Sequence, residues 1–303
     1  MRIAVIISTY NGNGFLKMQL DSILAQEDVD KYIFIRDDGS TDKTKEFLEE
    51  YCRNYSNITV EYGDNIGYAK SFFTMLFKAE GYDYYAFSDQ DDFWKPRKLI
   101  TACTMIGDTV TPTVYYSNLQ ICDENLNPRF ITQLEKRKKT LESVVTRRSI
   151  AGCTMVFNKA FFEVLTQGKN ADVVVNSHDN YIISLCYALN GNVICDRKHF
   201  IDYRQHSGNS SGTTHGIANR VKKEKKEIEK IKTGQSGEAR LAKSLLDNYS
   251  DKITQENKRK LKKICELDRF GISRLTLFFS PAYTTGNLVL TIVGKIKILL
   301  GWI

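Results

Sequence analysis

The chain has 303 residues, of which 42% are hydrophobic, 26% are charged and only 4 are proline. This length is enough for one large or two modest domains, at about 150 residues per domain, and the balanced composition argues against extensive disorder. The seven cysteines contain no C-x-x-C pair, so they fit neither a disulfide framework nor a zinc cluster. We therefore expect a folded chain with buried thiols in a reducing compartment.

The net charge of +7 is unevenly distributed. Residues 217–303 carry 19 Lys and Arg against 9 Asp and Glu, a net of +10, whereas residues 1–216 carry 24 against 27, a net of −3. A basic region can contact nucleic acid or anionic lipid, but the body of the chain has no nucleic-acid-binding motif. The apolar run after Met1 and Arg2 is too short for a signal peptide. We therefore expect a cytoplasmic protein whose basic region meets lipid at the inner membrane surface rather than nucleic acid.

Short apolar runs alternate with helix-like segments over the first 120 residues. The helix-like segments have apolar faces, such as Leu16, Leu20 and Ile23. Strands are expected at 2–8, 31–37, 58–62, 84–88 and 113–117. This alternation predicts an α/β fold, in which helices cover both faces of a mostly parallel sheet of the nucleotide-binding type.

The pattern changes beyond residue 118. Residues 118–149 are polar and basic, which predicts a solvated loop and helix face. A strand at 153–158, a helix from about Lys159, a helix at 180–189 and a strand at 191–196 are expected next. After about residue 216 only helical patterns remain, beginning at 220–232. We therefore expect a domain of residues 1–216 followed by a basic helical region, 217–303.

The last segment of the chain, 288–303, is strongly apolar but contains Lys295 and Lys297. It is shorter than the roughly 20 residues that a membrane-spanning helix needs. With Trp302 near its end, it predicts a helix that lies on a membrane surface. A helix packed on the protein's own core, or on a second copy in a homodimer, fits the pattern equally well.

The strongest chemical signal is the segment SDQDDFW at 88–94, which follows an apolar strand. Asp89, Asp91 and Asp92 would raise one another's proton affinity unless a cation neutralised them. Hard oxygen ligands suit Mg²⁺ or Mn²⁺, which also take ligands from water and substrate phosphates. Ligands of α/β folds bind at this carboxyl edge of the sheet. We therefore predict a divalent-metal site here, in preference to a turn that only caps the next helix.

Two further polar segments follow strands and would lie at the same edge. STYNG at 8–12 predicts a tight turn, and DDGSTD at 37–42 follows the second strand. In the latter, Ser40 or Thr41 with Asp42 would cap a helix, which leaves Asp38 to accept hydrogen bonds from a uracil or thymine base. The chain has neither a G-x-G-x-x-G fingerprint nor a P-loop, which disfavours a dehydrogenase or a kinase.

Together with DNIG at 64–67, these segments resemble family-2 glycosyltransferases in order and spacing. These are inverting, nucleotide-sugar-dependent enzymes with the GT-A fold, and the resemblance covers residues 1–210. The segment DQDDFW also resembles that of rhamnosyltransferase-like members, which build bacterial surface polysaccharide. The resemblance implies a UDP- or dTDP-sugar donor, in particular dTDP-rhamnose, a glycan or lipid-linked acceptor, and Mg²⁺ or Mn²⁺ as cofactor.

The resemblance also implies roles for matching positions. Donor-binding residues would be Thr9, Tyr10, Asn11, Asp38, Asn65, Gly67, Lys70 and Asp89. Asp91, the second Asp of the D-x-D pattern, would bind the metal that bridges the donor's two phosphates. In the segment YRQHSGN at 203–209, His206 would contact the metal and Arg204 the phosphate, although a lone histidine is as often structural. The Gly- and Ser-rich residues 207–216 predict a loop that closes over the donor.

An inverting transfer needs a general base that deprotonates the acceptor hydroxyl. Asp179, in HDN at 178–180, matches the family's late acidic motif and is predicted to be this base. Its alternative role is a helix N-cap. The alternative function is a non-catalytic nucleotide-sugar or glycan-binding module with the same fold, which would have little need of Asp179. A nucleotidyltransferase is disfavoured because no Gly-rich phosphate loop lies near the N-terminus.

Overall fold

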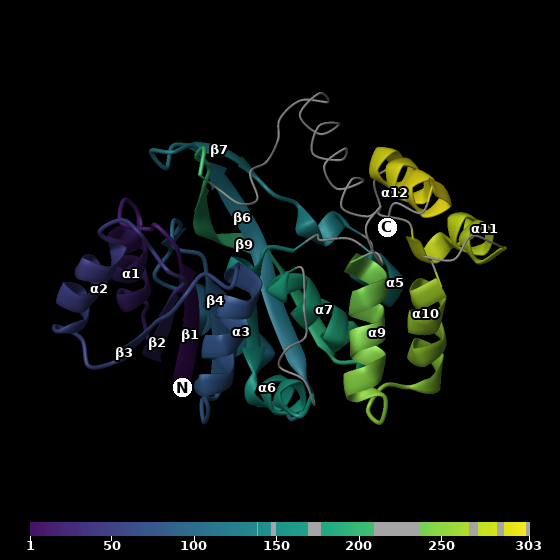
Figure 1. Ribbon diagram of the computed structural model, residues 1–303, viewed down its shortest axis with the longest axis horizontal. Helices are drawn as coiled ribbons and strands as arrows, with labels where there is room; N and C mark the ends of the chain where they lie inside the picture. The colour runs from purple at the N-terminus through teal and green to yellow at the C-terminus, as the bar shows by residue number, and fades with distance from the viewer. Residues whose placement is uncertain are drawn as a thin grey trace.

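The computed structural model describes residues 1–137, 139–146, 150–168, 177–208, 237–266, 272–283 and 288–300 (Figure 1). Within these residues nine strands form one sheet, in the order β3-β2-β1-β4-β8-β6-β9-β5, with β7 paired to β6. The strands are β1 (Arg2–Thr9), β2 (Asp30–Asp37), β3 (Ile58–Tyr62), β4 (Tyr84–Ser88), β5 (Phe93–Trp94), β6 (Thr113–Cys122), β7 (Pro128–Ile131), β8 (Val156–Asn158) and β9 (Asn192–Arg204). The predicted α/β fold is confirmed.

The helices follow the strands in alternation and then continue alone. They are α1 (Leu16–Leu24), α2 (Thr44–Cys52), α3 (Tyr68–Lys78), α4 (Lys98–Ile106), α5 (Leu141–Val145), α6 (Lys159–Thr166), α7 (His178–Ala188), α9 (Gly237–Tyr249), α10 (Gln255–Cys265), α11 (Ile272–Phe279) and α12 (Leu288–Leu300), with the short 3₁₀ helices η1 (Leu134–Lys136), η2 (Gly152–Thr154) and η4 (Pro281–Tyr283).

Strands β3, β2, β1 and β4 are parallel and in register. Thr9 at the end of β1 lies opposite Asp37 of β2, and Ile7 lies opposite Ser88, the last residue of β4. The carboxyl ends of these strands therefore meet at one edge of the sheet. This register brings the three polar segments that follow β1, β2 and β4 together, as the sequence predicts.

Two apolar cores lie on the two faces of the sheet. Ile3, Val5 and Ile7 of β1 pack with α1, α2 and α4 on one face. Ala4 and Ile6 belong to the core on the other face, which α3, α5, α6, α7 and the C-terminal helices cover. Strands buried on both faces read as nearly continuous apolar runs rather than as alternating patterns, which is why β1 was easy to predict.

Strands β6 and β9 are about twice as long as the sequence predicts. The expected strands at 113–117 and 191–196 extend to Cys122 and Arg204, and the two pair in parallel over most of this length. The prediction of a solvated segment from residue 118 is therefore wrong at its start. Asn118 is buried there because its side chain is satisfied: its amide donates to Arg197 O at 2.9 Å, and its Oδ1 accepts from Leu134 N at 2.8 Å.

The described elements after residue 236 are all helices, and they pack onto the body of the fold. Leu241 and Leu245 of α9 and Leu261 of α10 belong to the core that also contains Tyr181 and Leu185 of α7. Figure 1 shows α9 to α12 gathered at the end of the molecule away from α1 and α2. The predicted domain boundary at 216, the helix at 220–232, residues 209–216 of the predicted loop at 207–216, and Trp302 lie outside the described residues.

None of the described helices has the length and apolar character needed to cross a membrane. All seven cysteines have free thiols.

Candidate active site

Gln90 joins the first polar loop to the Asp-rich loop. Its Oε1 accepts hydrogen bonds from Thr9 Oγ1 at 2.7 Å and Tyr10 N at 2.9 Å, and its Nε2 donates to Tyr10 O at 3.2 Å. A side chain at Gly12 would not fit, because its Cβ would lie 2.6 Å from both Gln90 Oε1 and Thr9 Oγ1. Two predicted donor-binding residues, Thr9 and Tyr10, are thus fixed against the loop that carries the carboxylates. The role of Gln90 was not predicted from the sequence.

Asn11 joins the first loop to the second. It has a φ of 51°, its N–H donates to Ser40 Oγ at 2.9 Å, and its Oδ1 accepts from Thr41 N at 2.8 Å. The predicted helix cap at Ser40 or Thr41 is wrong, because α2 begins later, at Thr44. Ser40 and Thr41 instead form hydrogen bonds with Asn11. Ser and Thr residues near a tight turn can bond either a helix end or a neighbouring loop.

Asp38 is buried and holds the segment 64–67 in place. Its carboxylate is paired with the Arg36 guanidinium and accepts from Ile66 N at 3.0 Å and Gly67 N at 2.9 Å. Gly67 has a φ of 85°, which favours glycine. Asp38 and Gly67, both predicted to bind the donor, are therefore in direct contact. The contact of Asp38 with a base stays a prediction, and its pairing with Arg36 was not predicted from the sequence.

The two remaining predicted donor-binding residues on this side are exposed. Asn65 Oδ1 accepts from Gly67 N at 3.2 Å, and Lys70 lies near the start of α3 with its carbonyl bonded to Thr74. The contacts of the described residues do not join Lys70 to the Asp-rich loop.

Asp91 and His206, the two predicted metal ligands, lie next to each other. His206 Nε2 is 2.8 Å from Asp91 Oδ2, and the imidazole ring packs on Phe15, with ring centroids 4.6 Å apart. A carboxylate oxygen and an imidazole nitrogen at this separation fit one divalent cation, and the nitrogen ligand suits Mn²⁺ better than Mg²⁺. A polar pocket opens beside the pair and is lined by Asp123, Glu124, Asn125, Arg129, Gln205, His206 and Ser207.

Arg204 is buried beneath this pair. Its Nε donates to Asp91 O at 2.8 Å, its backbone N–H donates to Asp92 Oδ1 at 3.2 Å, and its guanidinium lies 4.7 Å from the centre of the Phe15 ring. These contacts tie the end of β9 to the Asp-rich loop, and they bring His206 to Asp91. The phosphate contact of Arg204 stays a prediction. Its hydrogen bonds to Asp91 and Asp92 show that it supports the Asp-rich loop.

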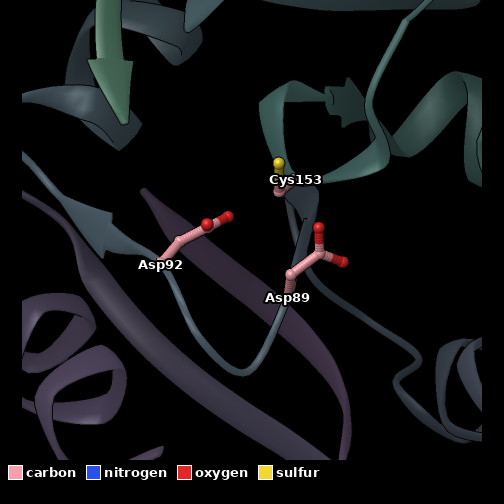
Figure 2. A group of neighbouring side chains, drawn as sticks. All are labelled: Asp89, Asp92 and Cys153. Atoms are coloured by element: carbon pink, nitrogen blue, oxygen red, sulfur yellow. The ribbon is translucent and has the colours of Figure 1, made fainter. Parts of the chain in front are cut away.

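Asp89, Asp92 and Cys153 form a compact group, with one ligand atom of each within 4.8 Å of the others (Figure 2). Burial, together with the negative charges of Asp91 and Asp179, raises the pKa of Asp89 to about 7. Burial, with the charges of Asp89 and Asp91, also raises the pKa of Asp92 well above its usual range, and burial raises that of the Cys153 thiol. Cys153 comes from η2 and was not predicted as part of the site.

Asp179, the predicted base, lies in the first turn of α7 and within electrostatic range of Asp89. The N-cap of α7 is Ser177, two residues earlier, so the alternative role of Asp179 as N-cap is wrong. Its neighbour His178 is buried against Phe72, with ring centroids 4.0 Å apart, and neither ring nitrogen has a hydrogen-bond partner among the residues that the structure describes. Burial lowers the pKa of His178 to about 3, so this imidazole is neutral and acts as a packing group.

A nucleotide-binding type of sheet, with a buried Asp-rich loop, a facing histidine and a further carboxylate at its carboxyl edge, defines a GT-A type transferase. Residues 4–166 match Glycosyl transferase family 2, and the chain belongs to this family. It is 32% identical over 217 residues to the dTDP-rhamnosyl transferase RfbG of Shigella flexneri, covering 68% of this chain and 73% of that protein.

Solved structures agree with the fold. The chain is similar to Staphylococcus aureus TarS 1-349 in complex with UDP-GlcNAc, with a TM-score of 0.56, 18% identity, and coverage of 100% of this chain and 91% of that one. It is also similar to the mannosyltransferase PcManGT of Pyrobaculum calidifontis in complex with GDP-Man and Mn²⁺, with a TM-score of 0.51, 17% identity, and coverage of 98% and 86%. At these identities the likeness establishes the fold alone.

Proposed function

We propose that this family-2 glycosyltransferase transfers a sugar with inversion from a UDP- or dTDP-sugar to a glycan or lipid-linked acceptor. The observation that carries the proposal is the grouping of Asp91 with His206, and of Asp89 with Asp179, at one edge of the sheet. The first pair has the chemistry to hold a divalent cation, and Asp179 supplies the separate carboxylate that an inverting transfer requires.

Each residue would have a distinct role in the reaction. Asp91 and His206 would hold Mn²⁺ or Mg²⁺, which when bound would stabilise negative charge on the departing diphosphate. Asp89 would face the ribose. Asp179 would accept the proton of the acceptor hydroxyl as the oxygen attacks the anomeric carbon from the side opposite the diphosphate. A binding module without chemistry would not require Asp179.

The donor is proposed to be dTDP-rhamnose, and the product a bacterial cell-surface polysaccharide. The support is the 32% identity to a protein named as a dTDP-rhamnosyl transferase, over about two thirds of this chain. The test is to incubate the purified chain with Mn²⁺, an acceptor extract and either dTDP-rhamnose or UDP-glucose. Release of dTDP from dTDP-rhamnose, with an inverted anomeric centre in the NMR spectrum of the product, supports the proposal. Binding of nucleotide without any transfer would favour the non-catalytic module.

The C-terminal helices are proposed to hold the enzyme at the inner face of the membrane. Leu275 and Phe279 of α11 are exposed one turn apart, as are Ile292 and Ile296 of α12, and Phe279 is 73% exposed. Helix α10 adds five basic residues against one acidic residue. An apolar face beside positive charge suits the surface of an anionic bilayer, where a lipid-linked acceptor would reside.

Vesicle sedimentation tests this surface. We expect the chain to bind phosphatidylglycerol vesicles more tightly than phosphatidylcholine vesicles, and Phe279→Glu to weaken the binding. Val110→Glu is the matched control, because Val110 is exposed but lies outside these helices. If instead Phe279→Glu converts a homodimer to a monomer in analytical ultracentrifugation and leaves vesicle binding unchanged, the surface is a dimer contact.

A further inference from the structure

The polar cavity beside the proposed metal ligands has a volume of about 470 Å³, and His206 forms part of its lining. One wall is the turn that joins β6 to β7, with residues 123–125 and Arg129. The other wall is the segment 205–207, which follows β9. The volume lies within the range of about 300–1,000 Å³ that is typical of small-molecule sites. The cavity is therefore large enough for a ligand that would lie next to the reacting groups.

The two walls are joined by the sheet and by hydrogen bonds. Strands β6 and β9 are parallel, and their last residues, Cys122 and Arg204, lie opposite each other. Gln205 N donates to Cys122 O at 3.2 Å, and the Arg204 guanidinium donates to Glu124 O. Because Arg204 also donates to Asp91 O, the turn is held in a fixed position relative to the Asp-rich loop.

The turn has one carboxylate that holds its shape and two charged groups that are uncommitted. The Asp123 carboxylate accepts from Asn125 N and Asn127 N, both at 2.9 Å, and from Asn127 Nδ2 at 3.0 Å. Glu124 and Arg129 are exposed, and neither side chain has a hydrogen bond or an ion pair with a described residue. Both side chains are therefore available to a ligand in the cavity.

The chemistry of the lining suits a sugar. The lining residues supply carboxylates, amides, a guanidinium, an imidazole and a hydroxyl. Among the described residues no apolar side chain lines the cavity, which disfavours a lipid tail or a stacked base as the ligand. Its carboxylates outnumber its guanidinium, which disfavours a phosphate. A hydroxyl group both donates and accepts hydrogen bonds, so a ring that carries several hydroxyls can pair with this mixed set.

The position of the cavity favours a sugar of the acceptor over the sugar of the donor. The predicted donor-binding residues lie on the loops after β1, β2, β3 and β4 and in α3, and none of them lines the cavity. The proposed donor sugar, rhamnose, has a methyl group in place of one hydroxyl. The described lining offers this methyl group no apolar side chain.

We propose that this cavity binds a neutral, fully hydroxylated sugar of the acceptor glycan, and that Glu124 and Arg129 select it by hydrogen bonding. The assignment to the acceptor rests on the proposed function. A site that pairs with hydroxyl groups discriminates against a sugar that lacks one, because its own polar groups are then left unpaired. The cavity would thereby determine which glycan end the enzyme extends.

Saturation-transfer NMR with three methyl glycosides tests the assignment. Methyl glucoside and methyl galactoside have a full set of hydroxyls, whereas methyl rhamnoside has a methyl group in place of one. Each glycoside is titrated into wild type, Glu124→Gln and Arg129→Ala, with and without dTDP and Mn²⁺. We expect wild type to bind one of the hexosides more tightly than the rhamnoside. Each variant should weaken this binding about tenfold, because it removes a charged hydrogen-bonding partner. The dTDP affinity in calorimetry should be unchanged.

Glu50→Gln and Arg53→Ala are the matched controls, because both residues are exposed at the end of α2 and outside the cavity. These variants should bind the hexoside like wild type. The proposal is overturned if wild type binds neither hexoside or prefers the rhamnoside, or if Glu124→Gln and Arg129→Ala bind the hexoside like the controls. Weaker dTDP binding with unchanged hexoside binding would assign the cavity to the donor and also overturn it. If wild type binds no dTDP, the proposed function fails, and the titrations without nucleotide still decide whether the cavity binds a sugar.

Discussion

The side chains of the site fall into two groups: those that hydrogen-bond to neighbouring loops, and carboxylates that lie close to one another. Gln90, Asn11, Asp38 and Arg204 are engaged with neighbouring loops. Asp91 and Asp179 each lie close enough to Asp89 to raise its pKa, together with burial. Since several carboxylates in one buried place are costly without a cation, we interpret the first group as the frame and the second as the chemistry.

Asp179→Asn tests the chemistry at the residue scale. The amide is the same size as the carboxylate but cannot accept a proton at neutral pH, so we expect kcat to fall by about 10²- to 10⁴-fold while the donor affinity is unchanged. Initial rates and calorimetric titration measure the two quantities. Glu142→Gln, an acidic residue in the first turn of α5, is the control. A variant that retains turnover would rule Asp179 out as the base.

At the scale of elements, the start of α7 is packed tightly against η2. A Cβ on Gly152 would lie 2.4 Å from His178 Nε2 and 3.3 Å from Asp179 Cβ. His178 cannot easily yield, because its ring packs on both Phe72 and Phe87, at centroid distances of 4.0 and 4.7 Å. The absence of a side chain at Gly152 therefore fixes how close Asp179 comes to the Asp-rich loop.

Gly152→Ala is expected to displace the start of α7 and, with it, Asp179. A misplacement of about 1 Å can cost about 100-fold in rate, so kcat should fall by about this amount with a smaller effect on donor affinity. In the control Gly14→Ala, the new Cβ would meet nothing within 4 Å, and kinetics should match wild type. Equal kcat values for the two variants would show that the contact does not position the base.

The buried imidazole of His178 also makes the stability of this element depend on pH. Its pKa is about 3 in the folded protein against about 6.5 when unfolded, so between these values only the unfolded chain binds the proton. The free energy of unfolding should fall by about 1.4 kcal/mol per pH unit as the pH drops below 6.5. Urea unfolding of wild type and His178→Phe between pH 7 and 5 measures this. Parallel pH curves for the two proteins would contradict it.

At the scale of the whole molecule, the parallel half of the sheet was predictable and the rest less so. Strands β1 and β4 are buried on both faces and have continuous apolar runs, so these strands and the polar segments that follow them could be placed from sequence. Asn118 and Gln120 interrupt the apolar pattern of β6 although they are buried, because long-range hydrogen bonds satisfy them. The apolar pattern therefore marks only the first half of β6, and the strand predicted from it is too short.

The same limit applies to the site. Asp89, Asp91, Asp179 and His206 could be selected from their motifs. Arg36 and Cys153 could not, because their places in the site depend on contacts that only the folded chain creates, and no spacing rule marks a buried arginine or thiol as part of a site.

The central claim is that Asp91 and His206 hold a metal ion that binds the nucleotide sugar, and calorimetry tests it most directly. Wild type and Asp91→Asn are titrated with UDP, dTDP, GDP and CMP, each with Mn²⁺ and with EDTA. We expect UDP or dTDP to bind wild type only with Mn²⁺, and Asp91→Asn to lose this metal-dependent binding. Equal affinity with Mn²⁺ and with EDTA, or undiminished binding by Asp91→Asn, would contradict the claim.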